Sequence, residues 1–210
     1  MTTIWGPLGW MSLHSVSIIY PDTPSEADKQ ILKRYVDLFR DTISCPYCQS
    51  HFSKILNNYS QEHPEWTNSK FDFFLFVVRA HNTVNNRLSK PKPGTVQECL
   101  DTYKRNTQIT PGIVYRQKYL EYLSRNWSIE MSGESIMRLS QVREMRRITE
   151  EYWNKRTDES TSKFNMSANV LALINEHGPG GPPSAPGSLS YAANNMVKIG
   201  FKGGKLRLRM

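Results

Sequence analysis

The sequence lacks the features that mark several common classes of protein. Its longest strictly apolar run, Phe73 to Val78, is far shorter than the roughly 20 residues that a membrane-spanning helix needs. The first residues, Met1 to Trp5, include no basic group, so we expect no secretory signal peptide. Three cysteines among 210 residues are too few for a secreted scaffold held together by disulfides. These absences predict a protein with no membrane partner that acts in the cytoplasm.

The excess of basic over acidic residues lies in the second half of the chain. The net charge is +8, and Lys and Arg outnumber Asp and Glu by only 11 to 10 in residues 1–104 but by 16 to 9 in residues 105–210. A basic segment can bind nucleic acid, an anionic surface or an acidic partner, although solvated charge without a partner is the commoner case. We therefore expect no nucleic-acid partner.

Apolar residues recur at spacings of three and four in the first hundred residues, which predicts helices. The first predicted helix covers residues 10–20. The second opens with a capping box at Thr23–Glu26 and ends near Ile43, the third starts at Pro46, and the fourth covers residues 68–88. The prolines of segment 90–94 end the last of these, and a short fifth helix is expected from Thr95. This order predicts an all-α fold, a four-helix bundle with a short fifth helix.

A second, mainly helical accessory domain is expected after a boundary near residues 105–111. Helical periodicity returns in residues 113–127, 134–153 and 168–174. The Gly- and Pro-rich stretch 178–188 is typical of a linker, and the basic tail after it suits a short edge strand or a disordered arm. We thus predict an enzyme domain at 1–105 and an accessory domain at 106–210, whose aromatic residues, Tyr122 and Trp127 among them, we interpret as core.

The strongest chemical signal is the sequence Cys45-Pro46-Tyr47-Cys48. Cys45 falls at the predicted N-cap of the third helix, with Pro46 at its first position. The positive end of the helix dipole favours a thiolate there, and a thiolate both attacks disulfides and leaves from them. We expect Cys45 and Cys48 to be the catalytic pair; two incidental buried thiols are the alternative.

Two further interpretations of this motif stay open. Glutaredoxins also carry Cys-Pro-Tyr-Cys, but they need a strand before the cysteines, whereas residues 35–43 have helical periodicity. A zinc-stapled or cofactor-free helical module would use its basic second half to bind nucleic acid or a partner. Its zinc form would need Cys45, Cys48, His51 and His63 as ligands, but the two histidines lie twelve residues apart, outside the usual ligand spacing. We therefore predict no metal.

Polar and aromatic residues elsewhere indicate a bound ligand. Trp10 and His14 lie at i and i+4 on one helix face, and His81 and Asn85 share an apolar stripe of the fourth helix. Polar side chains in an apolar stripe need buried partners. The pattern favours a flat, hydrogen-bonding ligand inside the bundle.

Three ordered motifs together resemble the Erv/ALR family of FAD-linked sulfhydryl oxidases. They are W-G-x3-W-x3-H from Trp5, C-x2-C-x2-H-F from Cys45 and H-N-x-V-N from His81. The resemblance covers about the first hundred residues, and the overall layout is similar to giant-virus members, such as that of mimivirus. It implies a helical bundle, usually a homodimer, that binds FAD non-covalently beside the CxxC disulfide.

The resemblance also implies roles for individual residues. Cys45 would accept electrons from substrate thiols, Cys48 would be the cysteine next to the flavin, and oxygen would be reduced to hydrogen peroxide. The implied FAD contacts are Gly6, Trp10, His14, His81, Asn82, Val84, Asn85, Leu88 and Lys90.

The cysteine content departs from the family pattern in two ways. The family's structural bridge is missing, because Val78 stands at one of its positions and Cys99 is left unpaired. No second CxxC or CxC pair exists to act as a shuttle. We therefore expect protein dithiol substrates to reach Cys45 directly, or through a thioredoxin-like carrier.

Overall fold

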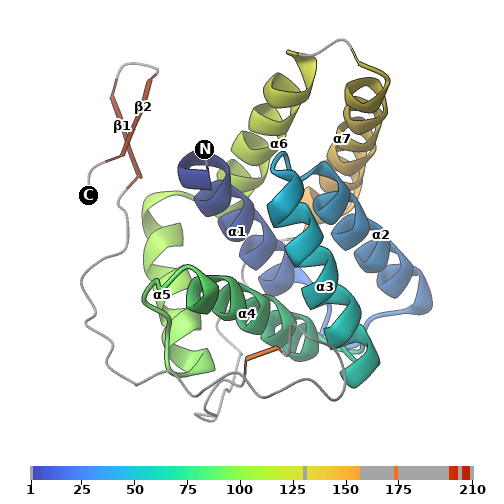
Figure 1. Ribbon diagram of the computed structural model, residues 1–210. Helices are drawn as coiled ribbons and strands as arrows, with labels where there is room; N and C mark the ends of the chain where they lie inside the picture. The colour runs from blue at the N-terminus through green and yellow to red at the C-terminus, as the bar shows by residue number, and fades with distance from the viewer. Residues whose placement is uncertain (1, 130–131, 157–172, 175–198, 203–204, 209–210) are drawn as a thin grey trace.

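Seven α-helices make up most of the computed structural model, which describes residues 2–129, 132–156, 173–174, 199–202 and 205–208 (Figure 1). The helices are α1 (Thr2–Ile19), α2 (Glu26–Thr42), α3 (Pro46–Glu62), α4 (Lys70–Arg87), α5 (Val96–Ile109), α6 (Gly112–Ser128) and α7 (Gly133–Glu151), with a 3-10 turn η1 (Trp153–Lys155). The predicted helical fold of the first hundred residues is confirmed. None of the described helices is long and apolar enough to cross a membrane.

The start of α2 corrects one prediction. Thr23 is not the N-cap; Ser25 is, with an extended backbone at φ −70° and ψ 167°. The Ser25 hydroxyl accepts from the Asp28 N–H at 3.2 Å, while the Asp28 carboxylate accepts from the Ser25 N–H at 2.9 Å. This reciprocal pair satisfies two N–H groups that a helix start leaves without partners, so the helix begins at Glu26.

The helices of the second half pack against those of the first. Figure 1 shows α6 beside α1 and α7 beside α2, and both pairs are in contact. One hydrophobic core contains residues from α1 to α4 and from α6, α7 and η1. Trp153 is fully buried there, with its ring 5.5 Å from that of Tyr35 and 6.3 Å from that of Tyr20. The predicted boundary region 105–111 includes the last residues of α5 and the break before α6, and the division into two domains at 105/106 stays a prediction.

A smaller core lies where α5 meets α1 and α4. Its buried members are Ile18, Phe74, Val78, Val96, Leu100 and Tyr103. Cys99 packs against this cluster as a free cysteine, as predicted. Burial in this apolar site raises the pKa of the Cys99 thiol to about 12.

The end of the chain is described only in part. The linker 178–188 and residues 168–172 of the predicted helix 168–174 lie outside the described residues, while residues 173–174 are not helical. Ile174 is buried, and its N–H donates to the Thr83 hydroxyl at 3.1 Å. In the tail, β1 (Ile199–Lys202) pairs antiparallel with β2 (Lys205–Leu208), so the strand interpretation holds there.

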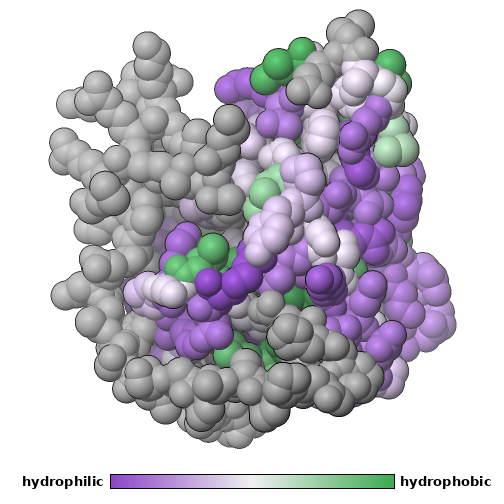
Figure 2. Space-filling view, in the orientation of Figure 1, coloured by the Kyte–Doolittle hydropathy of each residue, from purple (hydrophilic) through white to green (hydrophobic). Residues whose placement is uncertain are grey.

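The described surface is mostly polar on the side of α2 and α7, as Figure 2 shows. Green hydrophobic residues gather at the end where α6 and α7 meet. The exposed apolar side chains of these two helix ends are Ile129, Ile136 and Met137.

Candidate active site

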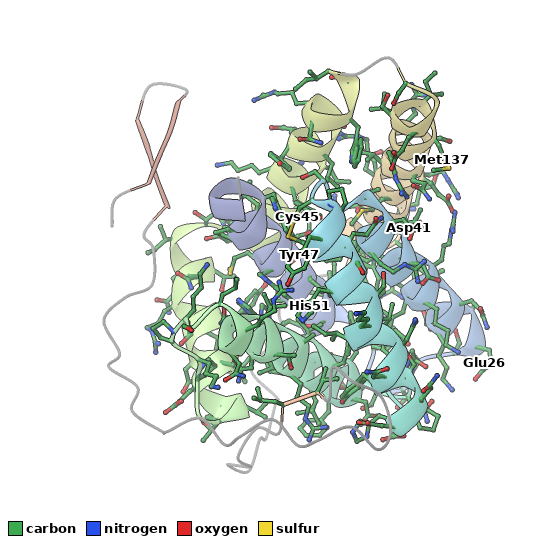
Figure 3. The ribbon with its side chains drawn as sticks, viewed as in Figure 1. Glu26, Asp41, Cys45, Tyr47, His51 and Met137 are labelled. Carbon is green, nitrogen blue, oxygen red and sulfur yellow. A yellow bond between two sulfur atoms is a disulfide. The ribbon has the colours of Figure 1, made fainter. Side chains whose placement is uncertain are left out.

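A disulfide joins Cys45 and Cys48 at the start of α3 (Figure 3). Cys45 is the N-cap with extended backbone, Pro46 follows at the first helical position, and the Cys45 Sγ accepts from the Cys48 N–H at 3.3 Å. Both cysteines are half-buried, while the Tyr47 side chain between them is 71% exposed. The predicted N-cap placement is therefore confirmed, and neither cysteine is fully buried. A thiolate released at Cys45 would face the positive end of the helix dipole.

Trp10, His14 and His81 form one cluster between α1 and α4. The Trp10 and His81 rings are stacked, with centroids 4.4 Å apart and planes within 8°. His14 Nε2 lies 3.1 Å from His81 Nδ1, so one nitrogen donates a hydrogen bond to the other. The structure thus brings together two motifs that are separated by 67 residues in the sequence.

Burial keeps both histidines neutral. It lowers the pKa of His14 from 6.5 to about 4. The pKa of His81 is lowered well below its usual value, first by burial and then by the neighbouring His14 and Lys90. A neutral imidazole offers one donor and one acceptor nitrogen, so the pair can hydrogen-bond a ligand without introducing charge.

Two buried ring nitrogen atoms of α1 have no hydrogen-bond partner in the described part of the chain. They are Nδ1 of His14 and Nε1 of Trp5. Buried polar groups without partners are rare and costly in native proteins, which points to a ligand at this place. Next to Trp5, an added Cβ at Gly6 would meet no heavy atom within 4 Å, so there is open space beside the backbone of α1.

Phe52 connects this cluster with the disulfide. It lies four residues after Cys48 on α3, hence on the same helix face one turn further along. Its ring centroid is 6.1 Å from that of Trp10. The disulfide and the Trp10–His81 stack therefore belong to one continuous site at the junction of α1, α3 and α4.

The other proposed FAD contacts are distributed around the end of α4. Asn82 is buried, and its side-chain amide donates to the Pro93 carbonyl at 3.2 Å. Val84 is half-buried against the core, and the Asn85 carbonyl accepts from the Lys90 N–H at 2.8 Å. Leu88 is 44% exposed and Lys90 is exposed. Asn82 and Asn85 thus hold the segment that follows α4, while His81 faces the cluster.

Arg87, in the last turn of α4, is a site residue that was not predicted. Its guanidinium carbon lies 4.9 Å from the centroid of the Tyr47 ring, a cation–π contact across the CxxC turn. Nε and Nη1 of Arg87 are buried without a partner among the described residues. The only sequence signal is the basic series Arg87, Lys90 and Lys92, which continues past the helix end.

Tyr122 and Trp127 of α6 were predicted only as core residues. The Tyr122 hydroxyl lies 3.1 Å from the Ser44 hydroxyl, and Trp127 Nε1 donates to the Thr42 carbonyl at 3.0 Å. Both contacts reach the segment that leads into Cys45. Aromatic residues at helical spacing do not reveal such contacts.

The residues of the zinc alternative do not converge. His63 is the C-cap of α3, whose N-cap is Cys45, so about 27 Å of helix separates them. In the part of the chain that the structure describes, no three His, Cys, Asp or Glu side chains are grouped as a metal site would need.

Comparisons of the sequence with known proteins identify its family. A model of the Erv1 / Alr family matches residues 8–107. The chain is 33% identical over 87 residues to the FAD-linked sulfhydryl oxidase of African swine fever virus, which covers 41% of this chain and 69% of the viral one. It is 28% identical over 107 residues to a probable FAD-linked sulfhydryl oxidase of Acanthamoeba polyphaga mimivirus, covering 51% and 72%. The chain therefore belongs to the Erv1 / Alr family.

The similarity is confined to one part of each protein. The mitochondrial FAD-linked sulfhydryl oxidase of Saccharomyces cerevisiae is 32% identical over 87 residues, which covers 41% of this chain but only 44% of the yeast protein. No solved structure matches the chain. The helices α6 and α7 lie beyond the segment that the family model matches.

Proposed function

We propose that this protein is an FAD-dependent thiol oxidase that forms disulfides in protein substrates through Cys45 and Cys48 and reduces oxygen to hydrogen peroxide. The observation that carries this proposal is the position of the disulfide at the start of α3, one side chain away from the Trp10–His81 stack. The relatives named FAD-linked sulfhydryl oxidase support the same activity.

The described residues fit FAD. The flavin or adenine ring needs flat aromatic neighbours and hydrogen-bonding groups, which Trp10, His81 and the unpaired Nδ1 of His14 supply. The diphosphate needs cations, and Arg87 and Lys90 stand at the end of α4. Gly6, Asn82, Val84, Asn85 and Leu88 complete the proposed contacts, Asn82 by holding the backbone at Pro93.

The cysteine chemistry follows from the N-cap geometry. A substrate thiolate attacks the Cys45 sulfur, the Cys45–Cys48 bond breaks, and Cys48 leaves as a thiolate. A second substrate thiolate then attacks the substrate sulfur of the mixed disulfide, which releases oxidised substrate and leaves Cys45 and Cys48 reduced. FAD, when bound, supplies the two-electron chemistry that links this dithiol to oxygen. The protein's residues position the cysteines and keep water away from the aromatic cluster.

Several finer features are proposed as well. A homodimer follows from the family resemblance, and the lack of a second CxxC or CxC pair favours protein dithiols that reach Cys45 directly or through a thioredoxin-like carrier. A cytoplasmic location and an accessory domain at 106–210, the latter inferred from helical periodicity, are also proposed. The glutaredoxin alternative is less well supported, because a helix, α2, precedes the cysteines where that fold needs a strand.

Peroxide production from a small dithiol under air tests the proposed activity. We expect Cys45→Ser and Cys48→Ser each to lower the rate to background, because neither variant can form the disulfide. Cys99→Ser is the matched control and should retain the wild-type rate, since Cys99 lies in the separate α5 core. Wild-type peroxide output from Cys48→Ser would contradict the assignment.

A further inference from the structure

The last carbonyls of α2 need hydrogen-bond donors from outside the helix. In an α-helix the carbonyl of residue i accepts from the N–H of residue i+4, but residue 46, four after Thr42, is a proline and has no N–H. Trp127 Nε1 of α6 donates to the Thr42 carbonyl instead, at 3.0 Å. The carbonyl of Asp41 accepts from the Gln49 side-chain amide at 2.9 Å. The chain is therefore held just before the redox disulfide.

A second contact from α6 reaches the residue next to Cys45. The hydroxyls of Ser44 and Tyr122 lie 3.1 Å apart, and Ser44 is half-buried. One turn earlier on α6, the Tyr119 ring lies 5.4 Å from that of Phe39. A Cβ added at Gly9 of α1 would lie 3.2 Å from the Tyr119 ring, so α6 is packed closely against α1. These contacts fix α6 in place, and Tyr122 and Trp127 with it.

We propose that α6 is a brace for the redox disulfide, with Tyr122 and Trp127 as positioning residues for Cys45. Only Ile43 and Ser44 separate the end of α2 from Cys45, so the two contacts leave this link little freedom. The link sets where the Cys45 sulfur lies relative to the Cys48 N–H, 3.3 Å away. The brace comes from beyond the family-matched segment 8–107, which gives the second half of this chain a part in the redox chemistry.

The brace favours the oxidised pair. Reduction of the disulfide lets residues 43–44 adopt more backbone conformations. The hydrogen bonds of Tyr122 and Trp127 restrict these residues and so oppose the gain in conformational entropy. In a thiol exchange, two glutathione molecules reduce the Cys45–Cys48 bond and leave as one glutathione disulfide, so the equilibrium constant reports this balance. Loss of one brace contact should shift that equilibrium toward the dithiol. A neutral hydrogen bond is worth a factor of about two to ten, which sets the size of the effect.

The test measures this equilibrium without oxygen, in defined glutathione mixtures, on the full-length protein as purified. Alkylation and mass spectrometry give the oxidised fraction of Cys45 and Cys48. Tyr122→Phe and Trp127→Phe keep their rings and should each shift the equilibrium toward the dithiol by about two- to tenfold. Tyr119→Phe is the matched control, because the buried Tyr119 hydroxyl has no partner in the described part of the chain, and it should leave the equilibrium unchanged.

A further variant separates the loss of the hydrogen bond from a loss of aromatic packing. Ser44→Ala removes the same contact from the other side without touching an aromatic ring, so it should give the same shift as Tyr122→Phe, and the double variant should add nothing further. Unchanged equilibria in Tyr122→Phe, Trp127→Phe and Ser44→Ala would overturn the brace. The redox role of the Cys45–Cys48 pair in turnover rests on the proposed oxidase function, but that function and the brace can fail separately. Absence of peroxide production refutes the oxidase, whereas an unshifted equilibrium refutes the brace.

Discussion

Acidification from pH 7.5 to pH 5 tests whether His14 is buried in its neutral form. The pKa of His14 is about 4 in the folded protein, and an unperturbed histidine, as in the unfolded chain, has a pKa of 6.5. Between pH 4 and pH 6.5 the unfolded chain therefore binds a proton at His14 that the folded chain does not bind. The free energy of unfolding is therefore unaffected by His14 above pH 6.5 and falls as the pH drops toward 4. At pH 5 the linkage relation gives a loss of about 2 kcal/mol.

Urea unfolding, followed by circular dichroism, measures this loss. Carboxylates also titrate in this range, so the informative quantity is the difference between variants. Wild-type protein should lose about 2 kcal/mol more than His14→Asn between the two pH values, because the variant has no imidazole to protonate at that position. Equal losses in the two proteins would refute the buried neutral state of His14.

Three further predictions concern stability and thiol reactivity. Native Cys99 should resist alkylation by iodoacetamide at pH 8 while reduced Cys45 and Cys48 react, because burial raises the pKa of the Cys99 thiol to about 12. Rapid labelling of Cys99, measured by mass spectrometry, would contradict this prediction. Ser25→Ala should lower the free energy of unfolding by about 1 kcal/mol through loss of the capping box, and an unchanged urea midpoint would argue against that box. Trp153→Ala should cost about 3–5 kcal/mol, since the ring is fully buried, and a loss below about 1 kcal/mol would show that α7 and η1 are not part of the common core.

Local features of the fold were predictable because they depend on neighbouring residues. Pro46 and the cysteine before it predict the start of α3 correctly, since the cap and the proline act within one turn. The start of α2 was predicted two residues early. Both Thr23 and Ser25 precede an acidic residue by three, and only the backbone shows that Ser25 receives the reciprocal hydrogen bonds.

Residue spacing predicts which side chains of the candidate site share a helix face, but not which helices bring these side chains together. The i, i+4 spacing places Trp10 and His14 on one face of α1, and their meeting with His81 follows the packing of α1 against α4. The contacts of Tyr122 and Trp127 could not be predicted in this way. They depend on how α6 lies on α1, which tertiary packing decides and which no local periodicity encodes.

The central claim is that the Cys45–Cys48 pair exchanges electrons with a flavin held beside Trp10 and His81. The most direct test is the absorption spectrum of the purified protein, recorded without oxygen before and after addition of a small dithiol. We expect yellow protein that releases FAD on denaturation, whose flavin absorption is bleached by the dithiol in the wild type and not in Cys48→Ser. Colourless protein, or a flavin spectrum that the dithiol leaves unchanged in the wild type, would contradict the claim.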